Sequence, residues 1–451
     1  MTDILHIGSA AGFSGDRTDA ALPVVRSLIE HAGPSALIFE TLAERTLALA
    51  QLARRADPAR GYEPLLDELL TPILGLCLKH GIPIISNFGA ANPPAAALRI
   101  RALARELGLP VPRIAVLAGD DLSGPEHRAL LRKHLGAVCD EQDIVCANAY
   151  QGADQIAMAL REGAQIVVAG RVADPSLTVG PAMAHYGWRA DDWQRLGRAT
   201  MVGHLLECGA QVTGGYFADP GYKEVPDLYN VGFPIAEIDA EGDCIIGKAA
   251  HTGGLVSEQT VKEQLIYELH DPSAYLTPDV IADISDARVH QLAPNRVQLE
   301  GVRGRERPAD LKVNVFSQGG WFVEGEISYA GPRAEARARL AGDVLQRRLG
   351  DTLTLRVDLI GAVSVFADDA GRMLRASQAS QPIQGQDIRL RVAATHADRA
   401  TAERLAREVN ALYTCGPAGG GGVRTAMRTR LNTFSCLIPR EALPASYTML
   451  D

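Results

Sequence analysis

The chain has 451 residues, a formal net charge of −9 and 47% hydrophobic residues, a composition typical of a soluble protein with more than one domain. The acidic balance excludes the basic face that nucleic-acid binding requires, and no apolar run reaches the roughly 20 residues that span a bilayer. The seven cysteines form no C-x-x-C pair, and the first residues lack the basic and apolar regions of a signal peptide. We therefore expect a cytoplasmic protein without nucleic-acid or membrane partners.

Short apolar strands alternate with helices over the first part of the chain. The pattern predicts helices over residues 18–31, 44–55, 62–79 and 94–107, with strands before, between and after them at 4–7, 36–39, 82–87, 113–117, 144–150 and 165–170. Strands buried on both faces are short and continuously apolar, and helices of this length can connect parallel neighbours. The sequence therefore predicts an α/β fold, in which residues 1–345 form a main domain around a parallel βαβ sheet.

Polar residues follow several of these strands directly. Because ligands of open α/β sheets bind at the carboxyl ends of the strands, some of these residues are expected to line a pocket. The candidates for substrate binding are Asp16, Arg17, Asn87, Asp120 and Asp121, and Glu40 occupies an equivalent place. For the first two, a local ion pair or a helix cap is the alternative. The glycine-rich turn before them lacks the spacing of a dinucleotide-binding loop.

Arg171 and Asp174 follow the strand expected at 165–170. A guanidinium at that place can hold a carboxylate or phosphate with two parallel hydrogen bonds, and a nearby carboxyl group can transfer protons. The alternative is a structural pair that holds the loop. We predict Arg171 as a substrate-binding residue and Asp174 as a catalytic one.

The stretch 201–254 is the densest in chemically useful residues. His204 and Glu207 are three positions apart and share a face if the segment is helical, so the carboxylate can orient the imidazole as a general base. An ordinary pair on a surface helix is the alternative. Gly214 and Gly215 allow close backbone approach to a ligand, and His251 lies in a second glycine-rich turn as a further candidate acid.

The last hundred residues predict a smaller α+β domain over 350–451, with strands at 353–359, 387–394 and 431–438 and a helix at 400–413. Four consecutive glycines precede Val423 and Arg424. They form either a flexible hinge or a nest of backbone N–H groups that binds an anion. On the second interpretation, Gly420, Gly421 and Arg424 join the substrate-binding candidates.

Several strings resemble the acyclic terpene utilization AtuA family: GFSGD at 12–16, AGDD at 118–121, AGRVADP at 169–175 and ECGAQVTGG at 207–215. The likeness covers about residues 4–345. The tail, with LYTCGPAGGGG at 412–422, is similar to the ferredoxin-fold domain that accompanies that family. The resemblance implies a ferredoxin-like C-terminal domain and a role in the breakdown of acyclic terpenes or other carboxylates through CoA thioesters. It assigns no catalytic residue.

Together these features predict a lyase, a hydratase or dehydratase that acts on a small-molecule carboxylate or acyl-CoA by His/carboxylate acid–base catalysis. One alternative is a carbon–carbon lyase or hydrolase that uses Mg²⁺ or Mn²⁺, with oxygen ligands from Asp16, Asp120, Asp121, Asp174 and Glu207. Another is a non-catalytic ligand-binding or assembly subunit of a catabolic complex. No motif demands another cofactor, and we expect a homo-oligomer because the small tail domain needs a surface on which to pack.

Overall fold

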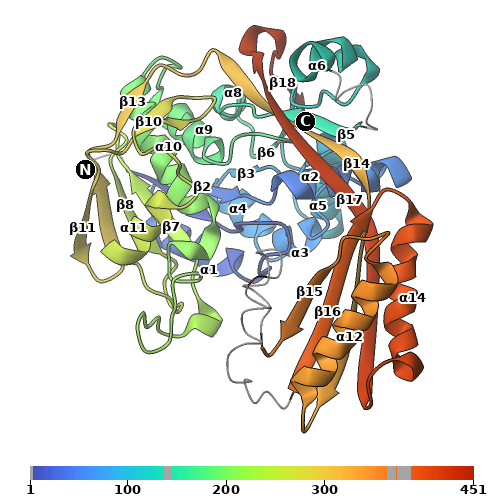
Figure 1. Ribbon diagram of the computed structural model, residues 1–451. Coiled ribbons are helices and arrows are strands. Elements are labelled where there is room, and N and C mark those ends of the chain that lie inside the picture. Colours follow the sequence, from blue (N-terminus) through green and yellow to red (C-terminus); the bar gives the residue numbers. More distant parts are fainter. Residues whose placement is uncertain (1–3, 137–143, 363–371, 373–386) are drawn as a thin grey trace. The chain divides into compact units, whose positions relative to one another are not determined.

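The computed structural model describes residues 4–136, 144–362, 372 and 387–451, and the chain divides into two compact units (Figure 1). The first unit contains the residues up to Phe316 together with Phe434–Asp451, and the second is Ser317–Thr433. The second unit is thus an insertion within the first. Its boundary differs from the one expected at 345–350, because strand β14 (Asp310–Ala330) continues from one unit into the other.

A ten-stranded mixed sheet forms the centre of the first unit, in the order β11-β12-β8-β7-β1-β2-β3-β6-β4-β18. Neighbouring strands from β1 to β4 pair in parallel, and the remaining pairs are antiparallel. The strands are β1 Leu5–Ser9, β2 Ser35–Phe39, β3 Ile84–Ser86, β4 Ile114–Ala118, β6 Ile166–Val168, β7 Pro234–Ile238, β8 Cys244–Lys248, β11 Arg288–Ala293, β12 Arg296–Glu300 and β18 Ser446–Leu450. Strand β5 (Ile144–Ala149) pairs with β14 instead.

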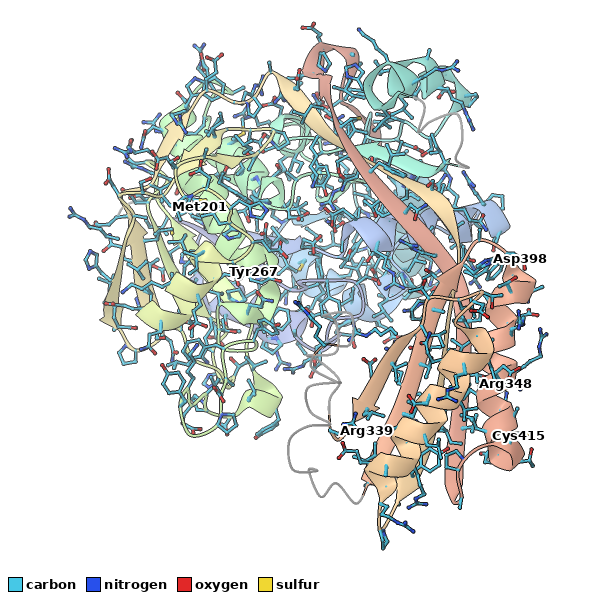
Figure 2. The ribbon with its side chains drawn as sticks, viewed as in Figure 1. Met201, Tyr267, Arg339, Arg348, Asp398 and Cys415 are labelled. Carbon is cyan, nitrogen blue, oxygen red and sulfur yellow. The ribbon has the colours of Figure 1, made fainter. Side chains whose placement is uncertain are left out.

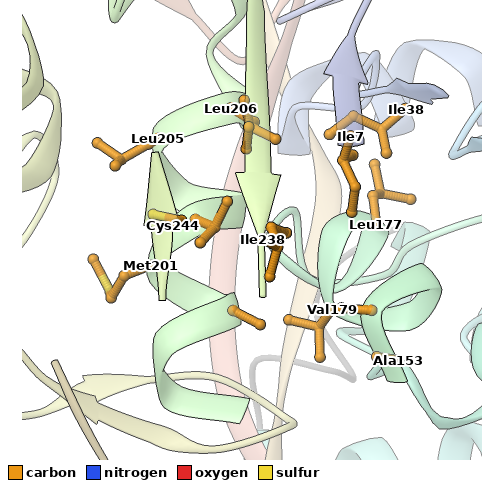
Figure 3. Packing of buried hydrophobic residues seen from close by; sticks show 14 of the residues in the cluster. Ile7, Ile38, Ala153, Leu177, Val179, Met201, Leu205, Leu206, Ile238 and Cys244 are labelled. Carbon is orange, nitrogen blue, oxygen red and sulfur yellow. The ribbon is translucent and has the colours of Figure 1, made fainter. Parts of the chain in front are cut away.

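Helices pack on both faces of the parallel strands, so alternate side chains of one strand enter different cores. Ile7 and Ile38 pack with residues of α8, α9 and α10, whereas Leu37 and Phe39 pack with α1, α3, α4 and α5. Figure 3 shows the first of these cores, where Met201, Leu205 and Leu206 of α10 meet the strands. The helices are α1 Ala21–His31, α2 Glu44–Ala56, α3 Leu66–Leu70, α4 Leu74–His80, α5 Pro93–Glu106, α6 Arg128–Leu135, α8 Asp154–Arg161, α9 Ser176–Tyr186, α10 Trp193–Glu207 and α11 Glu258–Ile266.

The single helix expected over 62–79 is two short helices, α3 and α4. Pro72 lies between them, and proline both lacks a backbone N–H and restricts the residue before it, so the chain turns there. The hairpin expected around residue 240 is present as β7 and β8, with Ile238 paired to Cys244. A separate three-stranded sheet contains β9 (Tyr275–Leu276), β10 (Ile281–Asp283) and β13 (Arg303–Arg305).

The second unit places two helices, α12 (Ala334–Leu349) and α14 (Arg399–Cys415), against a sheet ordered β15-β16-β14-β17. Its other strands are β15 Arg356–Ile360, β16 Asp387–His396 and β17 Gly420–Pro439. Figure 2 labels Arg348 on α12, whose guanidinium pairs with Glu408 of α14. Among the described helices, none is long and apolar enough to cross a membrane.

Candidate active site

The carboxyl ends of β2, β3 and β6 place three polar segments side by side. Glu40 follows β2, Asn87 follows β3, and the loop with Arg171 and Asp174 follows β6. These strands are parallel neighbours, so their carboxyl ends lie at one edge of the sheet. The sheet thereby brings together residues that lie far apart in the sequence.

Glu40 is buried and joined to Asn87. Its Oε1 accepts hydrogen bonds from Asn87 Nδ2 at 2.9 Å and from the backbone N–H of Leu42 at 2.8 Å, and the Asn87 Oδ1 accepts one from the Thr41 N–H at 2.8 Å. Burial and then the charge of Asp174 raise the pKa of Glu40 to about 8. The Glu40 carboxyl group therefore retains its proton at neutral pH, although two donors point at it.

Arg171 is the large buried cation of this edge, with 2% of its surface exposed. Its guanidinium donates to the carbonyls of Leu42 and Val172 and pairs with Asp174, and the ring of Tyr150 covers one face with its centroid 4.6 Å from Cζ. These partners engage the donors that a substrate carboxylate would need. The structure thus favours the alternative interpretation of Arg171 as a structural residue that holds the loop and the Asp174 carboxyl group.

Helix α10 brings His204 and Glu207 to the same loop. Gly203 lies against Pro175, where an added Cβ would come within 2.6 Å of Pro175 Cα, so the helix and the loop are in backbone contact. The Nδ1 of His204 lies 2.8 Å from Glu207 Oε1, and both residues are buried. In the described chain, His204 Nε2 and Glu207 Oε2 are buried atoms without a hydrogen-bond partner. Such atoms are costly unless a ligand or water contacts them.

The charges of these groups influence one another. Burial raises the pKa of Glu207 to about 7, with Asp174 and Glu268 adding to the rise and His204 opposing it. Burial, the largest single effect, lowers the pKa of His204, but the Glu207 carboxylate together with Gln264 and Glu268 raises it, and the net direction is upward. Burial raises the pKa of Asp174 as well. The pKa values of Glu207, His204 and Asp174 are thus all raised, a pattern that is common at acid–base sites.

Two members of this cluster reach solvent. The Asp174 side chain is 35% exposed, and Glu268 lies on an exposed segment after α11 with a positive φ of 56°. His204 and Glu207 are buried. Asp174 and Glu268 are thus the members of the cluster with side chains or segments at the surface.

Asp120 belongs to a neighbouring arrangement after β4. Its Oδ2 accepts hydrogen bonds from the Arg171 backbone N–H at 2.8 Å and from Asn148 Nδ2 at 3.0 Å, and burial raises its pKa to about 6. The cavity beside it, of about 10 Å³, has room for roughly one water molecule. The Asp121 carboxylate lies 3.5 Å from Arg54.

The remaining predicted site residues of the first unit lie in loops. Asp16 accepts hydrogen bonds from the Gly12 and Arg17 N–H groups, and Arg17 forms a local ion pair with Asp19 and donates to the Val231 carbonyl at 3.0 Å. Gly214 has a φ of 102° and packs against Val225. Gly215 is exposed and lies against Ala210.

His251 is exposed, with a φ of 58°, in the turn after β8. Within that turn Lys248 Nζ donates to the Thr252 carbonyl at 2.7 Å. Nothing in this local geometry brings the imidazole to the His204–Glu207 pair, so Asp174 is the better placed of the two predicted acids.

Gly420, Gly421 and Arg424 lie in the second unit, at the beginning of β17. The glycines start a strand there rather than forming a loop. A Cβ at Gly420 would come within 2.8 Å of Ile327 Cδ1. This close approach explains why a glycine occupies the position. Gly420 and Gly421 lie in the strand, between Gly419 and Gly422, which have positive φ of 73° and 65°.

Sequence reasoning did not single out the outer members of the cluster: Glu44, Tyr150, Glu268, Tyr275 and Asn314. Tyr150 donates to Glu44 Oε1 at 2.6 Å while its ring covers Arg171, and the Tyr275 ring centroid lies 5.2 Å from that of His204. Tyr150 directly follows β5, which is a signal that could have been used. Tyr275 reaches the site through a separate small sheet, and no local pattern indicates this.

In the described part of the chain, no group of three or more His, Cys, Asp or Glu side chains is arranged to hold a metal ion. The protein belongs to the acyclic terpene utilisation family AtuA, whose family model matches residues 5–449. No curated protein and no solved structure matches the chain.

Proposed function

We propose that the protein is a lyase that adds or removes water next to the carbonyl of a carboxylate or acyl-CoA thioester, with His204 as the general base. The observation that carries the proposal is the buried His204–Glu207 pair, in which Nδ1 contacts the carboxylate at 2.8 Å and Nε2 has no partner among the described residues. A carboxylate at Nδ1 favours the tautomer whose Nε2 lone pair is free to accept a proton.

Asp174 is the proposed acid. In dehydration, His204 Nε2 takes the proton from the carbon next to the carbonyl, and Asp174 gives a proton to the departing hydroxyl group, which leaves as water. The raised pKa of Asp174 and its partly exposed side chain support this role. Glu40 interacts electrostatically with Asp174 and keeps a proton at neutral pH, so it limits the negative charge that accumulates there.

The test is proton exchange in D₂O with matched 3-hydroxyacyl and 2-enoyl substrates, each supplied as the CoA thioester and as the free acid. We expect the protein to catalyse exchange of the hydrogen next to the carbonyl, as seen by NMR. His204→Asn should slow this exchange about 10²–10⁴-fold, the range of a lost general base. His290→Asn is the matched control, because it makes the same change in another histidine–glutamate pair. His290 lies 3.2 Å from Glu300, and both side chains of that pair are exposed.

Absence of exchange with every substrate would reject the lyase. Binding without turnover, unchanged in His204→Asn, would favour the alternative of a ligand-binding or assembly subunit. Exchange that depends on added Mg²⁺ or Mn²⁺ would favour the metal-dependent alternative.

We also propose a ferredoxin-like assignment for the second unit and a βαβ assignment for the parallel part of the first. The chain order β14-α12-β15-β16-α14-β17 and the sheet order β15-β16-β14-β17 support the former. The parallel pairing from β1 to β4 supports the latter. A crystal structure of residues 317–433 would test the first assignment.

A further inference from the structure

The two units have opposite charge. Residues 317–433 contain 16 Arg, no Lys and 12 Asp or Glu, whereas the whole chain contains 45 basic and 54 acidic residues. The inserted unit therefore has a formal charge of +4 and the remainder −13. Such asymmetry within one chain points to an electrostatic contact that uses it.

The positive charge of the second unit includes a row of arginines on β17, which we call the arginine edge: Arg424, Arg428 and Arg430. All three are exposed, and among the described residues none has a carboxylate partner. Their even spacing places them on one face of the strand. Arg428 lies over the Phe322 ring, with Cζ 4.6 Å from its centroid, so this face is the one that carries Phe322.

Strand β17 is also the last strand of its sheet. It pairs with β14 on one side, and in the described chain no strand pairs with its other side over the second unit. Neighbouring arginines on the same sheet are neutralised: Arg391 pairs with Glu324 and Asp358. The arginine edge thus combines a strand that is unpaired on one side with positive charge that no described carboxylate neutralises. These two properties favour the binding of an acidic partner.

The first unit carries a complementary surface in residues 216–229, which we call the tyrosine loop. Tyr216, Tyr222 and Tyr229 are 79%, 80% and 87% exposed and are the most exposed large hydrophobic side chains of the described chain. Exposed carboxylates alternate with them at Asp219, Glu224 and Asp227, and none of these forms an ion pair within the described residues.

The loop is ordered although its side chains are exposed. Asp219 and Lys223 exchange backbone hydrogen bonds of 2.9 and 2.7 Å, and Lys223 Nζ lies 4.6 Å from the Phe217 ring centroid. The Gly254 N–H donates to the Pro226 carbonyl at 2.8 Å, which ties the loop to the turn after β8. A preorganised loop loses little entropy on binding.

We propose that the tyrosine loop of one copy of this protein binds the arginine edge of a second copy. Arginine and tyrosine are among the residues enriched in protein–protein contacts, where guanidinium groups stack on phenol rings and pair with carboxylates. In a two-fold dimer each copy supplies one loop and one edge, so the contact occurs twice.

The experiment measures the mass of the full-length protein by light scattering after size exclusion, over a range of concentrations at low and high salt. We expect a dimer of twice the 48.1-kDa chain at low salt that dissociates at high salt, because the contact is between charges. The triple variants R424E/R428E/R430E and D219R/E224R/D227R should each weaken dimerisation at least tenfold. The variant with all six changes exchanges the two charges and should restore the dimer.

The control R347E/R404E/R407E removes the same charge from α12 and α14 and should leave the dimer unchanged. A monomer under all conditions would overturn the proposal. The proposal would also be overturned if either triple variant still formed the dimer, or if the variant with all six substitutions stayed monomeric. Proton exchange at the His204 site is measured separately, so the proposed lyase activity and the dimer contact can fail independently.

Discussion

Gly203 of α10 lies in backbone contact with Pro175, at a distance that leaves no room for a Cβ. The next residue of α10 is His204, and the residue before Pro175 is Asp174. This single close approach brings the proposed base and the proposed acid, from two different elements, to one place.

Gly203→Ala should therefore reduce both stability and activity. The added methyl group meets backbone atoms, which cannot move aside as a flexible side chain can, and overpacking of this kind costs about 1–3 kcal/mol. Urea unfolding measures the loss. Gly421→Ala is the control, since an added Cβ there meets no atom within 4 Å. Equal stability of the two variants would contradict the backbone contact.

Glu40→Gln should flatten the dependence of stability on pH. The folded state holds the Glu40 proton up to about pH 8, whereas the unfolded state releases it near 4.5. Between these values the folded protein binds the extra proton, so its stability falls as pH rises, by an amount on the order of a few kcal/mol in total. Relative to wild type, the variant should gain stability from pH 5 to 8 in denaturant titrations. The exposed Glu68→Gln serves as control, and an identical pH profile for Glu40→Gln and wild type would argue against a buried, protonated Glu40.

Glu207→Gln should shift the acidic limb of the exchange-rate profile to lower pH. The unprotonated imidazole is the base, so the rate falls as His204 takes up a proton. The Glu207 carboxylate raises the His204 pKa, and a neutral amide removes that effect. The profile of proton exchange from pH 5 to 9 shows the shift, together with a lower maximal rate. A limb that moves to higher pH would be inconsistent with the pair.

Arg171→Met should unfold the protein far more easily than a surface substitution. The change removes the partner of buried carbonyls and of Asp174, and breaking a buried ion pair costs about 3–5 kcal/mol. Arg189→Met removes an exposed pair with Asp191, which solvent screens, and should leave stability almost unchanged. Thermal and urea unfolding compare the two, and similar losses would mean that Arg171 does not hold the loop.

The sequence predicts where some of these residues lie in the fold, because the signals for their positions are local. The placement of Glu40, Asn87 and Asp174 after buried strands follows from the alternation of strands and helices, and three-residue spacing relates His204 to Glu207 on one helix. The role of Arg171 is not local. Its type suggested a ligand for substrate, but its partners at Leu42 and Tyr150 come from distant segments that only the folded sheet brings near.

The sequence alone also does not select one backbone structure for the four glycines before Val423. Four glycines are compatible with a hinge, a nest or a strand, because glycine adopts almost any backbone conformation. Contacts with Ile327 on a neighbouring strand select the third. The helix break at Pro72, in contrast, follows from the backbone properties of proline and could have been predicted from the sequence.

The pairing of β18 with β4 has a consequence for biosynthesis. Ser446 pairs with Ala118, although the whole inserted unit is translated between them. While the ribosome makes that unit, the edge of β4 has no partner and is open to incorrect association. Chaperones that shield an exposed strand edge should therefore raise the yield of native protein, and removal of the last six residues should cause aggregation even if the proposed catalytic pair is intact.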